Sequence, residues 1–226
     1  MYLQNKVFFT SDDIYEDMCK KIEKLEYMPG DSISENDLCA LYGVTRHSIR
    51  AALARLKQRR LVDVFPQRGT YVSLIDMAYI RNILYLREAV EQEALARIIL
   101  KKDKSMLLKT LRDCVYNQKN IDKSKNSSDE FYKYDDMFHK YILIEIGEEN
   151  VLDLISEHYI HVRRWRNLEV GTTERMESLI GEHEMIIEAI EKGDLSIGRK
   201  CMHYHLDTIE RYSEKIKDLK SQYFVE

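Results

Sequence analysis

The hydrophobic positions of the first sixty residues predict three helices. Over residues 11–25 apolar side chains recur at helical spacing at Ile14, Met18, Ile22 and Leu25. Residues 34–42 open with a serine and end at Gly43, which predicts a short second helix. A third helix over residues 45–60 begins at Thr45 and turns Ile49, Leu53 and Leu56 inward.

The pattern then changes twice. Residues 61–65 alternate like a strand, residues 66–69 form a turn and residues 70–73 return, which predicts a β-hairpin. From residue 76 onward only helical periodicity is present, with helices predicted over 77–101, 103–121, 129–147, 149–168, 172–192 and 195–219. We therefore predict a mostly α fold: an N-terminal winged helix-turn-helix of three helices and a hairpin (residues 1–75), joined to an all-α helical bundle (residues 76–226).

Composition supports the helical interpretation. The 226 residues include only 8 Gly and 2 Pro, which are too few turn-forming residues for an all-β chain. No stretch approaches the ~18 apolar residues of a membrane span, and the N-terminus lacks the features of a secretory signal. The four cysteines are widely spaced, as is typical of reduced thiols, so we expect a cytoplasmic protein.

Charge is distributed unevenly along the chain. The net charge is −4, yet residues 1–75 carry +1 and the remainder carries −5. Seven basic residues lie between Arg46 and Arg68, opposed only by Asp63. Such a window suggests a phosphate-facing patch; the alternative is a solvated helix face.

The position of this basic window favours nucleic-acid binding. Two helices separated by a tight turn around Gly43 have helix-turn-helix spacing, and the first turns of the second helix expose Arg46, His47, Ser48 and Arg50. That is where a recognition helix presents side chains to DNA. At the tip of the hairpin, Arg68 and Gly69 can approach the groove or backbone.

The segment LCALYGVTRHSIRAALARLKQRRLVDVFPQRGTYV resembles the winged helix-turn-helix of GntR-type bacterial transcription regulators. The resemblance implies that Arg46 and Arg50 are the principal DNA contacts and that Arg68 with Gly69 forms the wing tip. It gives Thr45, His47 and Ser48 supporting roles. His47-Ser48 stands where Thr-Pro is common, and Asn36 stands where some relatives carry an arginine that contacts DNA.

The second part of the chain places unusual polar residues on apolar helix faces. Asp135 and His139 are i,i+4 neighbours, and His183 and His205 each lie among apolar residues, whereas His203 points about 160° away from His205. Because buried carboxylates and imidazoles need a partner, a divalent Zn, Ni, Mn or Fe ion could satisfy all four. Taken singly, a histidine in such a position is more often an ordinary core or surface residue than a ligand.

Other residues of the bundle compete for such roles. His158 and His161 form an i,i+3 pair that we expect to be partly exposed. Arg163, Arg164 and Trp165 could line a cavity, although of two adjacent arginines on a helix one is usually exposed.

The segments DDMFHKYI, EHEMIIEAIEKGD and MHYHL are similar to signatures of the FCD effector domain found in the FadR branch of the GntR-type regulators. The resemblance implies a metal held by Asp135, His139, His183 and His205, and Arg87 facing a ligand cavity. It also implies a small carboxylate metabolite as effector, bound at the metal and releasing DNA.

These features together give a functional hypothesis. A homodimeric repressor, not an enzyme, binds an inverted-repeat operator, and an effector at the metal shifts its two winged domains. Two alternatives remain: a metal-dependent hydrolase, for which we find no general base or nucleophile motif, and a regulator whose signal is the metal itself.

Overall fold

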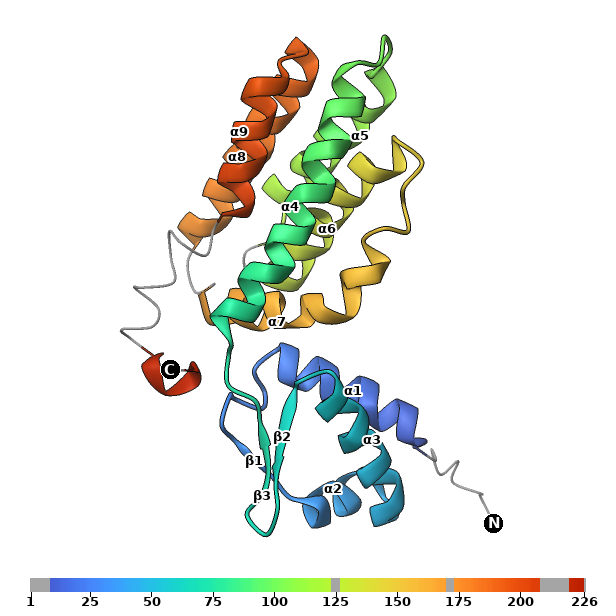
Figure 1. Cartoon of the computed structure of the whole chain (residues 1–226), viewed down its shortest axis with the longest axis vertical. Coiled ribbons are helices and arrows are strands. Elements are labelled where there is room, and N and C mark those ends of the chain that lie inside the picture. The colour runs from blue at the N-terminus through green and yellow to red at the C-terminus, as the bar shows by residue number, and fades with distance from the viewer. Residues whose placement is uncertain (1–8, 123–126, 170–172, 208–219, 226) are drawn as a thin grey trace. The chain divides into compact units, whose positions relative to one another are not determined.

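The computed structural model describes residues 9–122, 127–169, 173–207 and 220–225. It confirms the predicted fold class: helices dominate, and the strands form one small sheet in the N-terminal region (Figure 1). By its contacts the chain forms two compact units. The first contains the described residues within 1–76, 158–168 and 219–226, and the second contains those within 77–157 and 169–218. The sequence-based prediction placed the domain boundary after residue 75, and so assigned residues 158–168 and 219–226 to the helical bundle.

Three helices form the core of the first unit. They are α1 (Ser11–Glu23), α2 (Glu35–Tyr42) and α3 (Arg46–Gln58). The capping residue of α1 is Thr10, which bonds reciprocally with Asp13. Gly43 ends α2 in the left-handed conformation with φ of 66°, which a residue with a side chain adopts only at a cost. Ile14, Ile49 and Leu56 are fully buried against one another's helices.

The sheet of the first unit has three antiparallel strands in the order β1-β3-β2. Strands β2 (Val62–Phe65) and β3 (Gly69–Val72) form the predicted hairpin, with Val62 opposite Val72 and Phe65 opposite Gly69. The short β1 (Ser32–Ile33) was not predicted, because two residues show no alternation. After β3 the chain reaches Ile75, which forms a parallel bridge with Phe224, following a 3-10 turn (Ser221–Tyr223).

The second unit is a helical bundle (Figure 1). Its helices are α4 (Met77–Ile99), α5 (Ser105–Lys119), α6 (Ser127–Ile144), α8 (Thr173–Lys192) and α9 (Leu195–Leu206). Helix α5 packs against α6 and α8, α9 packs against α8 and α4, and α4 packs against α6, so the five helices close around a shared interior. The remaining helix, α7 (Asp153–Glu169), has its residues 158–168 in the first unit.

Helix ends differ slightly from the predictions. Helix α9 ends at Leu206, and the predicted continuation over residues 208–219 lies outside the described residues. Among the helices of the described residues, none combines the length and apolar character needed to cross a membrane.

Candidate metal centre and nucleic-acid interface

The structure brings together the four predicted ligands inside the second unit. Asp135 and His139 come from α6, His183 from α8 and His205 from α9, and each is fully buried. One ligand atom from each lies within 4.8 Å of the others. His139 Nε2 is 2.9 Å from His205 Nε2, and His183 Nε2 is 3.4 Å from Asp135 Oδ1. Helical spacing predicted that these residues lie on apolar helix faces, and the resemblance to the FCD domain implied that they converge.

Each histidine is oriented by a bond to its other ring nitrogen. His139 Nδ1 lies 2.5 Å from Glu91 Oε2, and His205 Nδ1 lies 2.9 Å from Glu182 Oε2. Since carboxylates accept hydrogen bonds, both Nδ1 atoms carry the proton. His183 Nδ1 is bonded in the same way to Gln118 Oε1, at 2.9 Å. All three Nε2 atoms are therefore left with a lone pair, and all three turn toward the same point.

This arrangement fits a cation. Two lone pairs 2.9 Å apart, on His139 and His205, repel unless a positive species lies between them. A proton is a poor solution: burial lowers the pKa of His139, and burial together with the neighbouring His183 lowers the pKa of His205 to about 3. His183 Nε2 is buried and makes no hydrogen bond within the described chain. Three imidazole nitrogens and a carboxylate are a donor set that suits Zn, Ni, Mn or Fe.

Two buried arginines complete the surroundings of these residues. Arg87 Nε donates to Glu91 Oε1 at 2.6 Å, and Arg175 Nη1 donates to Glu182 Oε1 at 3.3 Å. Burial alone would raise the pKa of Glu91, but the charge of Arg87 and the hydrogen bonds from Arg87 and His139 lower it to about 2. The predicted effector residue Arg87 is thus bound to the carboxylate that orients a candidate ligand.

Sequence reasoning missed Glu91, Gln118, Glu182 and Arg175. Their sequence signal is weak, because a single polar residue on an apolar helix stripe resembles an ordinary break in the pattern. Arg87 and Glu91, four residues apart on the buried face of α4, were the detectable pair.

The remaining histidines and arginines have other roles. His203 is exposed and bonded to Glu88 at 2.8 Å, as its rotation away from His205 predicts. His158 is exposed, but the expectation of partial exposure is wrong for His161, which is 5% exposed and bonds the carbonyl of Arg59. Arg164 is buried and binds Ser73 in the first unit, so it does not line the bundle interior.

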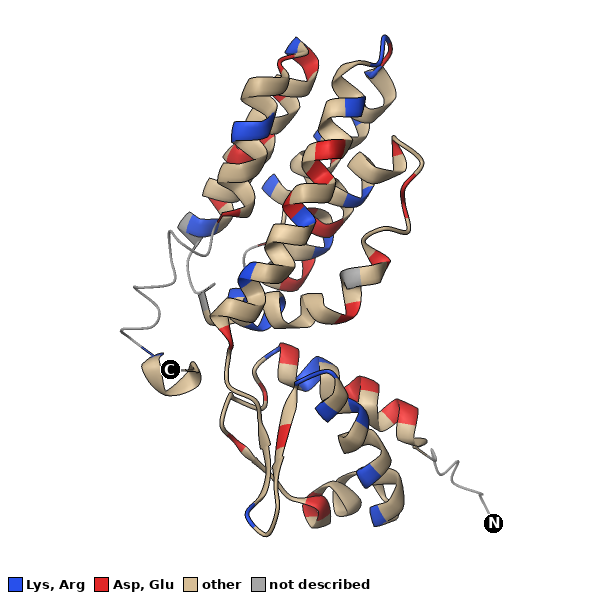
Figure 2. Ribbon diagram, in the orientation of Figure 1, with Lys and Arg blue, Asp and Glu red and all other residues tan. Residues whose placement is uncertain are grey.

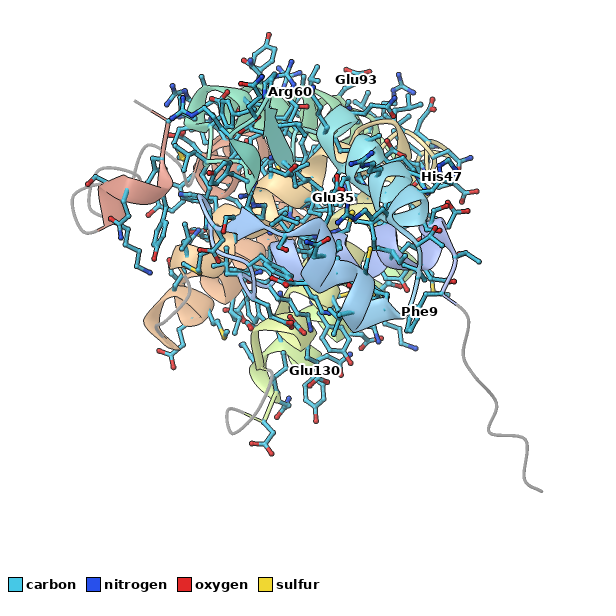
Figure 3. The ribbon with its side chains drawn as sticks, turned by 90° about the horizontal axis from the view of Figure 1, so that it is seen from below. Phe9, Glu35, His47, Arg60, Glu93 and Glu130 are labelled. Atoms are coloured by element: carbon cyan, nitrogen blue, oxygen red, sulfur yellow. The ribbon has the colours of Figure 1, made fainter. Side chains whose placement is uncertain are left out.

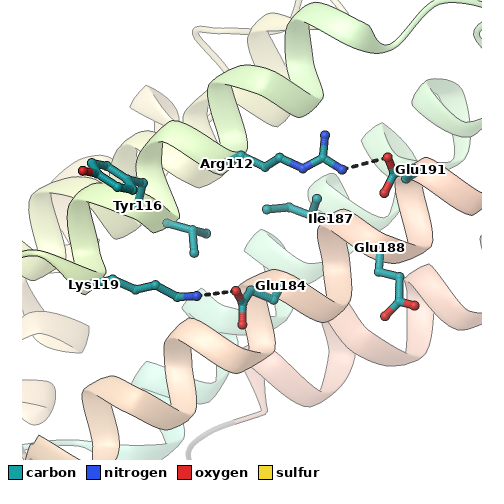
Figure 4. A pocket seen from close by; sticks show the side chains of 8 residues that line it. Arg112, Tyr116, Lys119, Glu184, Ile187, Glu188 and Glu191 are labelled. Carbon is teal, nitrogen blue, oxygen red and sulfur yellow. Dashed lines mark hydrogen bonds and ion pairs between the residues drawn. The ribbon is translucent and has the colours of Figure 1, made fainter.

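A separate hollow of about 350 Å³ lies between α5 and α8 (Figure 4). Val115 and Ile187 line it, and the ion pairs Arg112–Glu191 and Lys119–Glu184 cross it at 2.8 and 2.6 Å. None of the four candidate ligands lines this hollow. It is a solvated groove distinct from the histidine centre.

The predicted DNA-facing residues lie at the start of α3, where Lys and Arg recur along the helix (Figure 2). Arg46 and Arg50 are exposed. Arg46 Nη2 donates to Asn36 Oδ1 at 2.7 Å, and Arg50 Nε donates to both carboxylate oxygens of Glu35 at 3.0 Å. Helix α2 therefore supports both guanidinium groups.

The supporting residues surround these arginines. Thr45 and His47 are exposed and Ser48 is half-buried; His47 and Glu35 are labelled in Figure 3. Thr45 occupies the N-cap of α3, but its side chain makes no capping bond and instead lies 3.5 Å from Ser48 Oγ.

The wing tip is a tight turn. Arg68 N donates to Phe65 O at 3.1 Å, and Gln67 has φ of 61°. The adjoining Gly69, with φ of 112°, requires the freedom that glycine has. Arg68 is exposed, so its guanidinium extends from the tip.

Comparisons with known proteins agree with this arrangement. A family model described as "Bacterial regulatory proteins, gntR family" matches residues 10–72, and an FCD domain model matches residues 82–208. Together these matches span both the DNA-facing residues and the buried histidine centre.

Similar proteins extend over most of the chain. An uncharacterised HTH-type transcriptional regulator of Streptomyces ambofaciens is 33% identical over 88% of this chain and 84% of its own length. The HTH-type transcriptional repressor RspR of Escherichia coli is 27% identical over 96% and 94%. A solved GntR regulator from Rhodococcus shares the fold with a TM-score of 0.68, at 18% identity over 91% of this chain and 96% of that one.

Proposed function

Because the chain belongs to the GntR family of DNA-binding bacterial transcriptional regulators and carries an FCD domain, not an enzyme's catalytic domain, we propose that it is a metal-dependent, carboxylate-responsive repressor. Asp135, His139, His183 and His205 hold a divalent ion in the helical bundle. A small organic acid bound at that ion alters the affinity for operator DNA. The observation that carries this proposal is the convergence of three Nε2 atoms whose Nδ1 protons are all committed elsewhere.

The ligand set constrains the ion without fixing it. Imidazole nitrogens with one carboxylate oxygen accept Zn, Ni, Mn or Fe. When bound, the ion supplies a Lewis-acidic anchor for a carboxylate oxygen. Glu91, Gln118 and Glu182 keep the three imidazoles in the tautomer that can ligate.

An anionic effector suits the charges around the centre. Arg87 and Arg175 are both buried beside it, each bound to a glutamate that orients a histidine. A guanidinium can bind a carboxylate in a bidentate fork. Arg87 is the residue that we assign to the effector, in exchange for part of its bond to Glu91.

DNA recognition is assigned to the exposed face of α3 and to the wing. Arg46 and Arg50 make the principal contacts, Thr45, His47 and Ser48 assist, and Arg68 with Gly69 reaches the backbone or minor groove. Because such readers act in pairs on successive turns of one DNA face, the protein binds as a homodimer to an inverted repeat. It acts in the cytoplasm, and the name of its relative RspR supports repression.

The test separates effector from metal. Duplexes selected from a random pool by the full chain serve as the operator, and fluorescence anisotropy follows binding while zinc is titrated alone. A panel of sugar acids and dicarboxylates is then titrated at fixed zinc. The proposal expects release by an acid only when zinc is present, and no such release in His183→Gln.

The other outcomes are equally informative. Release by zinc alone would make the ion itself the signal and overturn the carboxylate assignment. Turnover of any acid would contradict a purely regulatory role. If wild type and His183→Gln bind zinc equally by calorimetry, the ligand assignment is wrong.

A further inference from the structure

The second part of helix α7 is built into the DNA-reading unit. Residues 158–168 cluster with the winged helix-turn-helix, although more than eighty residues separate the two segments in sequence. Ile160 belongs to the same hydrophobic core as α1 and α3, and Trp165 is fully buried. The family model of the DNA-binding domain covers only residues 10–72. The unit that contains the winged helix-turn-helix therefore also includes part of a helix from outside the matched DNA-binding domain.

Three polar side chains of α7, spaced three residues apart, bond to the ends of helices and strands of the winged helix-turn-helix. His161 Nε2 is 2.9 Å from the carbonyl of Arg59, the C-cap of α3. Asn167 Nδ2 donates to the carbonyl of Glu23, the last residue of α1, at 2.7 Å. The carbonyls at helix C-termini have no partner inside the helix. Helix α7 thus caps both α1 and the recognition helix α3.

The middle residue of the three connects α3 with the wing. Arg164 donates from Nη2 to Ser73 O at 2.6 Å and from Nη1 to Ser73 Oγ at 3.1 Å. Ser73 Oγ donates onward to the carbonyl of Arg60 at 2.6 Å, and Ser73 N donates to Leu61 O at 3.0 Å. Ser73 directly follows β3, and Arg60 directly follows the C-cap of α3. One guanidinium therefore ties the base of the wing to the end of the recognition helix.

Two features show that this junction is constrained. Arg60 adopts φ of 57°, a left-handed conformation that a residue with a side chain rarely holds without support. Arg164 is fully buried, and burying a guanidinium is costly unless it is hydrogen-bonded. The bonds through Ser73 give both Nη atoms of Arg164 an acceptor and also bind the carbonyl of Arg60. A hydrophobic residue at position 164 would fill the space but would hold neither carbonyl.

We propose that Arg164 is a positioning residue for DNA binding, which fixes the spacing between the recognition helix and the wing through Ser73. Arg46 and Arg50 lie at the far end of α3 from this junction, and Arg68 lies at the far end of the hairpin. Helix α3 has 13 residues and a rise of about 1.5 Å each, so a tilt of roughly 5° at its base moves its tip by about 2 Å. Helix α3 and the wing must be correctly spaced for their arginines to reach DNA phosphates at the same time. A shift of this size would break some of these contacts.

The experiment compares operator affinity and its salt dependence in the full chain. Fluorescence anisotropy on duplexes selected by the wild type, with chelator present, makes the result independent of the proposed metal. The variants are Arg164→Met, Ser73→Ala and Arg164→Lys, with Arg199→Met, an exposed arginine of α9, as the matched control. Helix content by circular dichroism and the midpoint of unfolding in urea check that each variant is folded.

The salt slope distinguishes positioning from mere loss of folded protein. The salt slope is the slope of the logarithm of the binding constant against the logarithm of the salt concentration. A smaller active fraction lowers the apparent affinity without changing this slope, whereas each lost phosphate contact reduces its magnitude by about 0.9. We expect about tenfold weaker binding and a reduced slope for Arg164→Met, since its charged hydrogen bonds are lost. A smaller change is expected for Ser73→Ala, partial recovery for Arg164→Lys and no change for Arg199→Met.

Wild-type affinity in a folded Arg164→Met variant would overturn the proposal, as would weaker binding with an unchanged slope. If Arg164→Met does not fold, Ser73→Ala, which keeps the guanidinium and the backbone carbonyl, decides by the same two criteria.

Discussion

His139 and His205 face each other through their Nε2 atoms at 2.9 Å, although 66 residues separate them in the chain. Both rings are fully buried, and both Nδ1 protons are committed to carboxylates, on Glu91 and Glu182. Two unprotonated nitrogens at this distance repel each other. The bundle therefore brings α6 and α9 together in a way that a bound cation would make favourable, which links metal binding to bundle stability.

The first prediction concerns that stability. Zinc at a hundredfold excess over its dissociation constant should raise the free energy of unfolding by about 2.7 kcal/mol. His205→Gln should abolish most of this gain, because it removes a ligand nitrogen. Differential scanning calorimetry of the full chain with zinc or with chelator measures both quantities.

The matched control for this prediction is His203→Gln. His203 lies two residues away on the same helix but is exposed, so its removal should leave the zinc effect intact. An equal loss in both variants would show that the zinc binds elsewhere.

The carboxylates behind the histidines should tune the affinity for metal. Glu182→Gln weakens the acceptor that holds His205 Nδ1–H, and residues in this position typically contribute 10–100-fold in metal affinity. We expect a loss of about that size for Glu182→Gln and for Glu91→Gln in competition with a chelating dye. Glu93→Gln, on the exposed face of α4, should bind zinc like the wild type; if it weakens binding equally, the orienting role is refuted.

Much of the candidate centre could be predicted from sequence because its ligands follow helix geometry. Asp135 and His139 are one turn apart on an apolar stripe, and His205 is distinguished from His203 by rotation alone. Gln118 could not be found in this way. It is a lone polar residue on the apolar stripe of α5, and its partner His183 lies on α8, so only the folded bundle shows what its side-chain oxygen binds.

The first unit shows the same limit. The three helices and the hairpin follow from local periodicity, caps and turns. That residues 158–168 join them does not follow, because the hydrophobic face of α7 does not indicate which core it enters. His161, which was expected to be partly exposed, is buried in the first unit, and Arg164, which was considered for a ligand cavity, binds Ser73.

Substitutions in the recognition helix should weaken operator binding. Arg46→Ala and Arg50→Ala each remove an exposed guanidinium, so each should lower affinity and reduce the salt slope by about 1 if it contacts a phosphate. Gel-shift titrations at several salt concentrations measure both quantities. Lys20→Ala, an exposed basic residue of α1, is the control for a general change in charge. Unchanged affinity in both arginine variants would reject the assigned helix.

Acid should destabilise the protein partly through His161. Burial lowers the pKa of this residue from 6.5 to about 4. As the pH falls below 6.5, His161 becomes protonated in the unfolded chain, but in the folded chain it is protonated only near pH 4. The stability present at neutral pH is therefore lost between these two pH values. Two pH units below 6.5 correspond to at most about 2.7 kcal/mol.

His161→Gln keeps a donor for the Arg59 carbonyl but does not titrate. Its free energy of unfolding, measured in urea, should therefore fall less between pH 7 and pH 4.5 than that of the wild type. His47→Gln, which changes an exposed histidine of α3, should follow the wild-type curve. Parallel curves for all three proteins would mean that His161 is protonated in the folded state at the same pH as in the unfolded chain.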